Sequence, residues 1–238
     1  MHIGVPKEIK TKEFRVGLVP SSVAELCARG HQVVVETGAG AGIGASDQDY
    51  QAAGASIAAM PGDVFDQAEM IIKVKEPQLN ECAMLKPHHT LFTYLHLAAD
   101  KPQAEALCAS GCLAIAYETV TSAQGTLPLL QPMSEVAGRM SIQIGANALM
   151  KHAGGQGLLL SGVPGVAPAR VVILGGGVAG ENALQMALGL RADVTIFERN
   201  LRRIAELDRH YGERARIAYS TGAAVREAVI AADLVIGA

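Results

Sequence analysis

The sequence contains no tryptophan, and aromatic residues make up only 4% of its 238 residues, although half of the chain is hydrophobic. A core with so few large rings must be built from Val, Ile, Leu and Ala. That composition is typical of parallel sheets covered by helices. The shortage of aromatic residues therefore favours the α/β class.

The sequence also lacks the features of proteins that bind nucleic acids, membranes or metals. Its formal net charge is −3, which provides no overall positive field for nucleic acid or an anionic membrane. Gly, Pro or charged residues interrupt every apolar stretch before it reaches membrane-spanning length, and residues 1–8 do not resemble a signal peptide. The four cysteines form no C-x-x-C pair and have no partners at ligand spacing. We therefore expect a soluble, cytoplasmic protein that acts on small molecules and holds no metal.

Strand-like runs alternate with helical patterns along the chain. Strands are predicted at residues 3–5, 31–36, 70–74, 90–95 and 113–117, and helices at residues 47–53 and 102–110. A capping-box pattern from Ser22 to Glu25 predicts the start of another helix, which ends at Gly30. This alternation predicts βαβ units and mostly parallel sheets.

A proline-containing stretch at residues 126–132 predicts a linker, and residues 134–152 read as one long connecting helix. We place a domain boundary near residue 130. Residues 1–130 are then a substrate-binding and catalytic domain, and residues 131–238 a nucleotide-binding domain that the long helix opens. The predicted fold is two doubly wound parallel-sheet domains, the second of the Rossmann type.

A glycine-rich turn follows the buried strand predicted at residues 170–174. In this turn Gly175 allows the tight bend, Gly177 lets the backbone approach a pyrophosphate, and Gly180 lets the following helix pack against the strand. The next strand ends at Glu198, at about the twenty-residue spacing of a ribose-binding acid. An ordinary glycine turn between strand and helix would not need that acid. The combination predicts dinucleotide binding.

The residues around Glu198 bear on the choice of cofactor. The Glu198 carboxylate would accept hydrogen bonds from ribose hydroxyls and repel a 2′-phosphate, which favours NAD. Arg199, Arg202 and Arg203 either hold such a phosphate or form a solvated helix face. The earlier glycine run from Gly38 to Gly44 lacks the third glycine and the partner acid, and we predict an ordinary turn there.

Three polar residues follow predicted strands of the first domain. Arg15 follows the first strand, Lys75 ends the strand at 70–74, and His96 ends the strand at 90–95. Side chains beyond the carboxyl ends of parallel strands can converge on one small anion. Taken singly, Arg15 can be a surface charge, Lys75 a strand-end lysine with its stem on apolar surface, and His96 a half-buried histidine.

Several segments resemble the alanine dehydrogenases over the whole chain. They are Gly4–Ile9, Glu13–Pro20, Lys73–Pro77, Tyr94–Leu97, Pro132–Arg139, and the glycine turn with Asp233–Ala238. The resemblance implies reversible oxidative deamination of L-alanine to pyruvate and ammonia, with hydride passing to NAD. It also implies a homo-oligomer, a hexamer.

The resemblance further implies roles for individual residues. Arg15 would clamp the substrate carboxylate, Lys75 would bind the substrate and polarise the pyruvate oxygen, and His96 would be the acid–base group. The remaining matches are cofactor-contacting positions: Ser134, Gly175, Gly177, Val178, Ala179, Gly180, Glu198, Arg203 and Ser220.

Two alternatives stay open. The NAD-binding portion of a proton-translocating transhydrogenase has a similar two-domain layout, but its pattern lacks the lysine of Lys73–Pro77 and the histidine of Tyr94–Leu97. The second domain has about four predicted strands where the complete fold has six, so we expect it to be incomplete and to leave an apolar sheet edge. A truncated, inactive paralogue that serves as a binding or interaction module is the other alternative.

Overall fold

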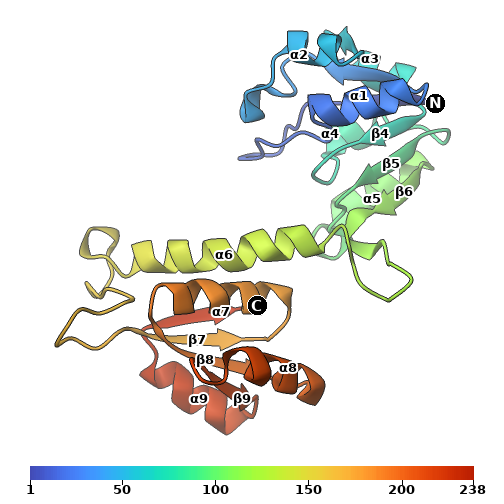
Figure 1. Ribbon diagram of the computed structural model, residues 1–238. Coiled ribbons are helices and arrows are strands. Elements are labelled where there is room, and N and C mark those ends of the chain that lie inside the picture. Colours follow the sequence, from blue (N-terminus) through green and yellow to red (C-terminus); the bar gives the residue numbers. More distant parts are fainter. The chain divides into compact units, whose positions relative to one another are not determined.

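A computed structural model describes residues 1–238, and the chain divides into two compact units, Met1–Leu129 and Leu130–Ala238. Each unit is a parallel sheet with helices, as Figure 1 shows. The predicted α/β class with parallel sheets is therefore confirmed.

Unit 1 is built on a six-stranded parallel sheet in the order β3-β2-β1-β4-β5-β6. Its strands are β1 His2–Val5, β2 Gln32–Glu36, β3 Ser56–Ala58, β4 Met70–Ile72, β5 Thr90–Thr93 and β6 Leu113–Ala116. Its helices are α1 Pro20–Ala28, α2 Asp47–Ala52, α3 Pro61–Gln67, α4 Leu79–Cys82 and α5 Lys101–Ser110, with short 3-10 turns η1 Ala41–Ile43, η2 Leu97–Ala99 and η3 Tyr117–Thr119. The direction of strand order reverses between β1 and β4. In such sheets ligands bind outside the carboxyl ends of the strands at this reversal.

Helices cover both faces of the unit 1 sheet. Alternate residues of a strand point to opposite sides, and in β2 the side chains on both sides are buried against helices. Val33 and Val35 of β2 join the apolar cluster that includes Val23 of α1 and Tyr50 of α2. Val34 lies in another cluster with Val64 of α3. This two-sided burial explains why the strands read as continuous Val and Ile runs.

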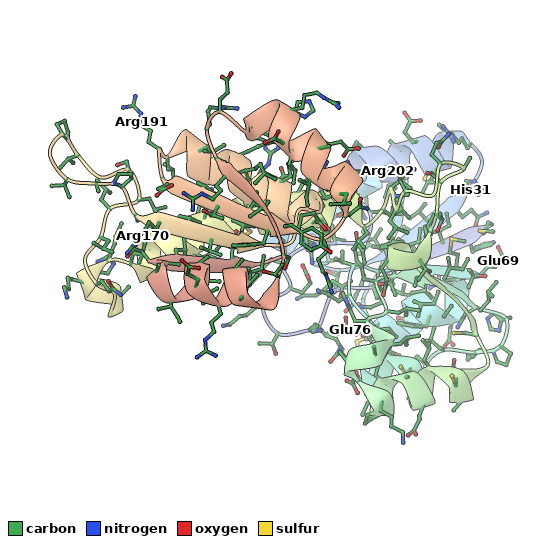
Figure 2. The ribbon with its side chains drawn as sticks, turned by 90° about the horizontal axis from the view of Figure 1, so that it is seen from below. His31, Glu69, Glu76, Arg170, Arg191 and Arg202 are labelled. Carbon is green, nitrogen blue, oxygen red and sulfur yellow. The ribbon has the colours of Figure 1, made fainter.

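Unit 2 has a four-stranded parallel sheet in the order β10-β7-β8-β9. Its strands are β7 Arg170–Leu174, β8 Asp193–Glu198, β9 Arg216–Tyr219 and β10 Leu234–Gly237, and its helices are α6 Gln131–Ala148, α7 Val178–Gly189, α8 Leu201–Tyr211 and α9 Gly222–Ala231, with the 3-10 turn η4 Lys151–Ala153. The strand order reverses between β7 and β10. The turn after α7 places Arg191 at φ 59, and its side chain points away from the unit (Figure 2).

Several predicted boundaries were wrong. Ser22 does not cap a helix: α1 begins at Pro20, whose fixed φ suits the first helical turn, and has no side-chain cap. The capping box of this region lies before α2, where Ser46 and Asp49 exchange hydrogen bonds. The long helix begins at Gln131 and ends at Ala148, ahead of Gly154, which has φ 85. The strands at 70–74 and 90–95 end early, at Ile72 and Thr93.

Candidate functional site

The three candidate residues of unit 1 lie around the reversal in strand order. Lys75 follows β4, His96 follows β5, and Arg15 lies in the loop before α1. The Glu13 carboxyl lies close to two of these residues. Its pKa is lowered to about 2, mainly by the hydrogen bond from Arg15 and to a smaller extent by the charge of Lys75. Arg15 also lies near the Tyr94 hydroxyl. Burial raises the pKa of this hydroxyl, and the charge of Arg15 counteracts part of that shift. The Tyr94 ring stacks on His96 at 6.0 Å between centroids. The fold therefore brings Arg15, Lys75 and His96 into one neighbourhood.

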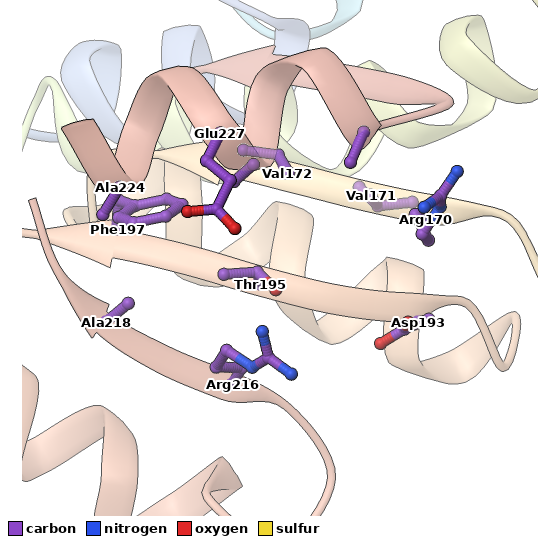
Figure 3. A pocket seen from close by; sticks show the side chains of 12 residues that line it. Arg170, Val171, Val172, Asp193, Thr195, Phe197, Arg216, Ala218, Ala224 and Glu227 are labelled. Atoms are coloured by element: carbon purple, nitrogen blue, oxygen red, sulfur yellow. The ribbon is translucent and has the colours of Figure 1, made fainter. Parts of the chain in front are cut away.

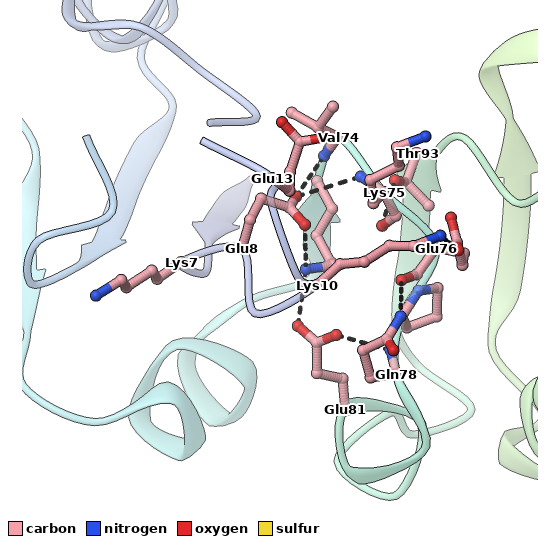
Figure 4. Close-up of polar contacts among 12 residues, drawn as sticks. Lys7, Glu8, Lys10, Glu13, Val74, Lys75, Glu76, Gln78, Glu81 and Thr93 are labelled. Carbon is pink, nitrogen blue, oxygen red and sulfur yellow. Dashed lines mark hydrogen bonds and ion pairs between the residues drawn. The ribbon is translucent and has the colours of Figure 1, made fainter. Parts of the chain in front are cut away.

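The backbone at Lys75 is held by the carboxylate of Glu8 (Figure 4). Glu8 Oε1 accepts hydrogen bonds from Val74 N at 2.6 Å and from Lys75 N at 3.3 Å. On the other side, Thr93 Oγ1 donates to the Lys75 carbonyl at 2.9 Å. Because β1 ends at Val5, a side chain takes the place of the missing strand partner. The Glu8 carboxylate thus replaces the β1 backbone as the acceptor for Val74 and Lys75, which explains why β4 ends at Ile72.

Lys73 differs completely from Lys75, two residues later. Its side chain is fully buried, and its ammonium lies 3.1 Å from Glu8 Oε2 and 2.7 Å from Glu81 Oε1. Burial raises the pKa of Glu81, and Lys73 counteracts that shift. Lys73 is thus a structural cation in a buried cluster with Glu8 and Glu81, a role that was not predicted from the sequence. One of its partners, Glu81, lies eight residues along the chain, but the other, Glu8, lies 65 residues away, so the sequence carried no local signal for the pair.

Arg15 is paired with Glu13 through two parallel hydrogen bonds. Arg15 Nε donates to Glu13 Oε1 at 2.8 Å, and the terminal nitrogen Nη2 donates to Oε2 at 2.6 Å. The arginine side chain is 44% exposed and that of Glu13 only 7%. The hydrogen bond to Glu13 is the main cause that raises the pKa of Arg15, so the guanidinium stays charged. A bidentate fork of this kind is suited to carboxylates.

His96 is exposed and has a left-handed backbone, with φ 47 and ψ 35. Few residues other than glycine adopt this conformation unless their surroundings impose it. Two neighbours are in place to do so. The ring stacks on Tyr94, and the backbone N–H donates to Glu118 Oε1 at 2.8 Å. Glu118 was missed from the sequence because it lies 22 residues away.

In unit 2 the glycine turn lies at the reversal in strand order between β7 and β10. Gly175 has φ 107, and a Cβ there would lie 2.3 Å from the Ala238 carbonyl oxygen beyond β10. A Cβ on Gly180 would lie 1.9 Å from the Gly175 carbonyl oxygen, so this glycine lets α7 pack against the turn. A Cβ on Gly177 would meet nothing within 4 Å. Gly177 therefore borders open space at the N-terminus of α7, beside Val178 and Ala179.

Glu198, the predicted ribose-binding acid, closes the turn from β8. Its carboxylate accepts hydrogen bonds from the N–H groups of Gly176 at 2.8 Å, Arg199 at 2.6 Å and Asn200 at 2.8 Å. These backbone donors, that of Asn200 most strongly, lower the pKa of Glu198. The carboxylate is therefore ionised and anchored next to the open side of the turn.

Arg203 supports the same turn from α8. Its Nε donates to the Gly176 carbonyl at 2.6 Å, and its terminal nitrogens pair with Glu181 at 2.5 Å and Glu206 at 3.1 Å. Burial opposes the charge of Arg203, but the two carboxylates outweigh it and raise its pKa. The guanidinium is thus bound to protein groups, whereas Arg199 and Arg202 are exposed.

Ser134 and Ser220 lie on other elements of unit 2. Ser134 is half-buried in the first turns of α6, and Ser220 follows β9, where its N–H donates to the Glu198 carbonyl at 2.9 Å. The Pro132–Arg139 motif has a packing role. A Cβ on Gly138 would lie 2.1 Å from the Ala179 carbonyl oxygen, and Arg139 Nε donates to Asn182 at 2.8 Å. This motif therefore fastens α6 to α7 directly behind the glycine turn.

A separate cavity of about 390 Å³ lies between α9 and the sheet of unit 2 (Figure 3). Glu227 of α9 points towards Thr195 and Phe197 of β8, and Arg216 of β9 lies beside them. None of the predicted site residues lines this cavity. No group of three or more His, Cys, Asp or Glu side chains could hold a metal ion, and no helix is both long and apolar enough to cross a membrane.

The strand orders and the glycine turn define a protein of two α/β units, of which the second has a Rossmann-type nucleotide-binding fold. The N-terminal domain of the family Alanine dehydrogenase/PNT matches residues 4–137, and its C-terminal domain matches residues 141–238. The chain belongs to this family.

Curated relatives and solved structures agree with this assignment. The chain is 55% identical over 238 residues to an alanine dehydrogenase of Halomonas elongata and 53% identical over 236 residues to that of Bacillus subtilis. These matches cover 100% and 99% of this chain, but only 64% and 62% of the relatives. A solved L-alanine dehydrogenase superposes with a TM-score of 0.91 at 51% identity, covering 99% of this chain and 65% of that one. A transhydrogenase of Sinorhizobium meliloti superposes with a TM-score of 0.80 at 25% identity, covering 100% and 69%.

Proposed function

We propose that the protein catalyses the reversible, NAD-dependent oxidative deamination of L-alanine to pyruvate and ammonia. The observation that carries the proposal is the arrangement of Arg15, Lys75 and His96 around the strand reversal of unit 1. Identities of 55% and 53% to curated alanine dehydrogenases support it.

In unit 1 a small 2-keto acid would meet one cation at its carboxylate and another at its carbonyl oxygen. The Arg15 guanidinium would bind the carboxylate, and Glu13 would hold the guanidinium in orientation through the two hydrogen bonds along its Nε–Nη2 edge. Lys75 would bind the substrate and polarise the carbonyl oxygen of pyruvate. His96 would move the proton at the carbonyl or carbinolamine stage. The backbone hydrogen bonds at Lys75 and His96 keep both groups in place before substrate arrives.

Unit 2 contains the features that a dinucleotide needs. The open side of Gly177 leaves room for a pyrophosphate at the N-terminus of α7, where free N–H groups favour negative charge. Gly175, Val178, Ala179 and Gly180 would form the rest of this turn. NAD, when bound, would supply the hydride acceptor.

The remaining cofactor residues would act around the adenosine half. The ionised Glu198 would accept hydrogen bonds from the ribose hydroxyls, which favours NAD over NADP. Arg203 would act indirectly by holding the Gly176 carbonyl. Ser134 and Ser220 would provide hydroxyl contacts from α6 and from the loop after β9.

The finer assignments follow from the same proposal. The protein would work in the cytoplasm on small molecules, without a nucleic-acid or membrane partner, and would assemble as a homo-oligomer, a hexamer. Size-exclusion chromatography with light scattering tests the assembly, and a monomer at micromolar concentration would contradict it.

The experiment that tests the function measures NADH formation spectrophotometrically, with the 238-residue chain, L-alanine and NAD. We expect turnover in the wild type and its loss in Lys75→Ala, with NADH binding retained because Lys75 lies in the other unit. Lys101→Ala is the matched control, since its side chain is 85% exposed. NADH binding without any alanine-dependent turnover would favour a binding module instead. Normal turnover in Lys75→Ala would refute the role of that lysine.

A further inference from the structure

The left-handed backbone of His96 needs an explanation, because an L side chain rarely adopts this conformation without being held there. Glycine would be the usual choice for such a turn. The histidine at this position must therefore be maintained by contacts from neighbouring elements.

The carboxylate of Glu118 provides those contacts. Glu118 lies in η3, directly after β6, which pairs with β5. Its Oε1 accepts hydrogen bonds from Leu95 N at 3.0 Å and His96 N at 2.8 Å, and its Oε2 lies 3.2 Å from Leu95 N. Two successive N–H groups that converge on one anion form a concave backbone binding site.

The charge state of Glu118 agrees with this arrangement. Burial opposes its ionisation, but the backbone N–H groups of His96, of Glu118 itself and of Leu95 outweigh that effect, so the pKa of Glu118 lies below its usual range. The carboxylate is therefore an acceptor only. All of its hydrogen bonds go to backbone N–H groups, and none goes to the His96 ring.

The neighbouring strand end uses the same device. Glu8 accepts hydrogen bonds from the successive N–H groups of Val74 and Lys75. The two strand ends are joined to each other, because Tyr94 N donates to the Val74 carbonyl at 3.3 Å. Glu8 also pairs with buried Lys73, so its removal would have a second effect. Glu118 makes no comparable buried ion pair, although its charge also acts through space on the His96 ring.

We propose that Glu118 is a positioning residue for His96: its carboxylate holds the backbone turn that presents the imidazole to the substrate site. The consequence for turnover rests on the proposed function. The structural part does not, and it can be measured without substrate.

The structural part is tested by NMR on the 238-residue chain, comparing the wild type with Glu118→Gln. The amide of glutamine would turn one acceptor oxygen into a donor that opposes the N–H groups. We expect hydrogen exchange at Leu95 and His96 to become about tenfold faster, together with a displaced resonance of the His96 ring. Glu105→Gln, at an exposed position of α5, is the matched control and should leave both unchanged. Unchanged exchange and ring resonances in Glu118→Gln would overturn the proposal.

The functional part is tested by a double-mutant cycle in the alanine-dependent assay. Displacing an acid–base group by about 1 Å can cost about 100-fold in rate, so we expect kcat of Glu118→Gln to fall about 10- to 100-fold with an unchanged KM for NAD. Glu118→Asp should restore part of the loss. In a His96→Ala background, Glu118→Gln should have no further effect. An equal loss in that background would show a general structural role and overturn the proposal.

A failure of the proposed function can be distinguished from a failure of the role proposed for Glu118. A wild-type chain without alanine-dependent turnover would refute the proposed function. The NMR comparison would then decide the role of Glu118 alone, since a displaced His96 ring supports positioning and an unmoved one refutes it.

Discussion

Replacing each of two glycines of the nucleotide turn by an alanine residue is predicted to impair different properties, stability for Gly180 and NADH binding for Gly177. A Cβ on Gly180 would lie 1.9 Å from the carbonyl oxygen of Gly175, whereas a Cβ on Gly177 would meet nothing within 4 Å. The atom that Gly180 would strike belongs to the backbone and cannot rotate away. Gly189, at the last turn of the same helix, also has open space around it and serves as the control.

The magnitudes follow from these distances. Ordinary contact begins at 3.4 Å, so α7 must move about 1.5 Å away from the turn in Gly180→Ala. Forcing such a shift costs about 3 kcal/mol, and the better helix propensity of alanine returns about 1 kcal/mol. The net loss is about 2 kcal/mol. Gly189→Ala has only the propensity gain of about 0.5–1 kcal/mol, and Gly177→Ala should change stability by less than about 1 kcal/mol.

Urea denaturation and NADH titration by fluorescence separate the three variants. Gly180→Ala should lower the free energy of unfolding, and Gly189→Ala should raise it. Gly177→Ala should fold normally but bind NADH about tenfold more weakly, a loss of about 1.4 kcal/mol, because its methyl group enters the side where a pyrophosphate approaches. Wild-type stability of Gly180→Ala, or wild-type NADH affinity of Gly177→Ala, would refute this assignment of the two glycines.

Three further outcomes can be measured by denaturation. Lys73→Met should lose about 3–5 kcal/mol of stability, because it leaves two buried carboxylates without their cation. A loss no larger than that of Lys101→Met, at an exposed lysine, would contradict a structural role for Lys73. Gln103→Leu should gain about 1 kcal/mol, since both polar atoms of this buried amide lack a partner, and a loss would indicate a bound water. Burial lowers the pKa of His89, so the unfolded state binds more protons and stability should fall as the pH drops below about 6.5. His89→Asn should show a weaker fall, and an unchanged pH profile would exclude His89 as its source.

The sequence predicted the glycine turn because its chemistry is local. Gly175, Gly180 and the strand and helix around them lie within a few residues of each other, and Glu198 follows at a known spacing. The candidate residues Arg15, Lys75 and His96 could be predicted to share a region, since the carboxyl ends of parallel strands lie at one edge of the sheet.

The supporting carboxylates could not be predicted in the same way. Glu8 contacts residues 65 to 67 positions away, and Glu118 contacts residues 22 and 23 positions away. Both bind backbone N–H groups, which leave no mark in the pattern of side chains. Lys73 and Lys75 stand two residues apart in the same motif, and only the buried positions of Glu8 and Glu81 separate the structural Lys73 from the half-buried Lys75.

The comparison of the two sheets shows why one unit suits a dinucleotide and the other does not. The order β3-β2-β1-β4 of unit 1 corresponds to β9-β8-β7-β10 of unit 2, with the same reversal after the first strand. In unit 2 that reversal holds an open glycine turn at a helix N-terminus. In unit 1 the Glu8 carboxylate spans the same position and takes the N–H groups of Val74 and Lys75. A negative charge that already uses the available donors would repel a pyrophosphate, while the nearby cations Arg15 and Lys75 would attract a small carboxylate. The two units share their strand order, so the proposed division of labour between them would follow from the group that occupies each reversal.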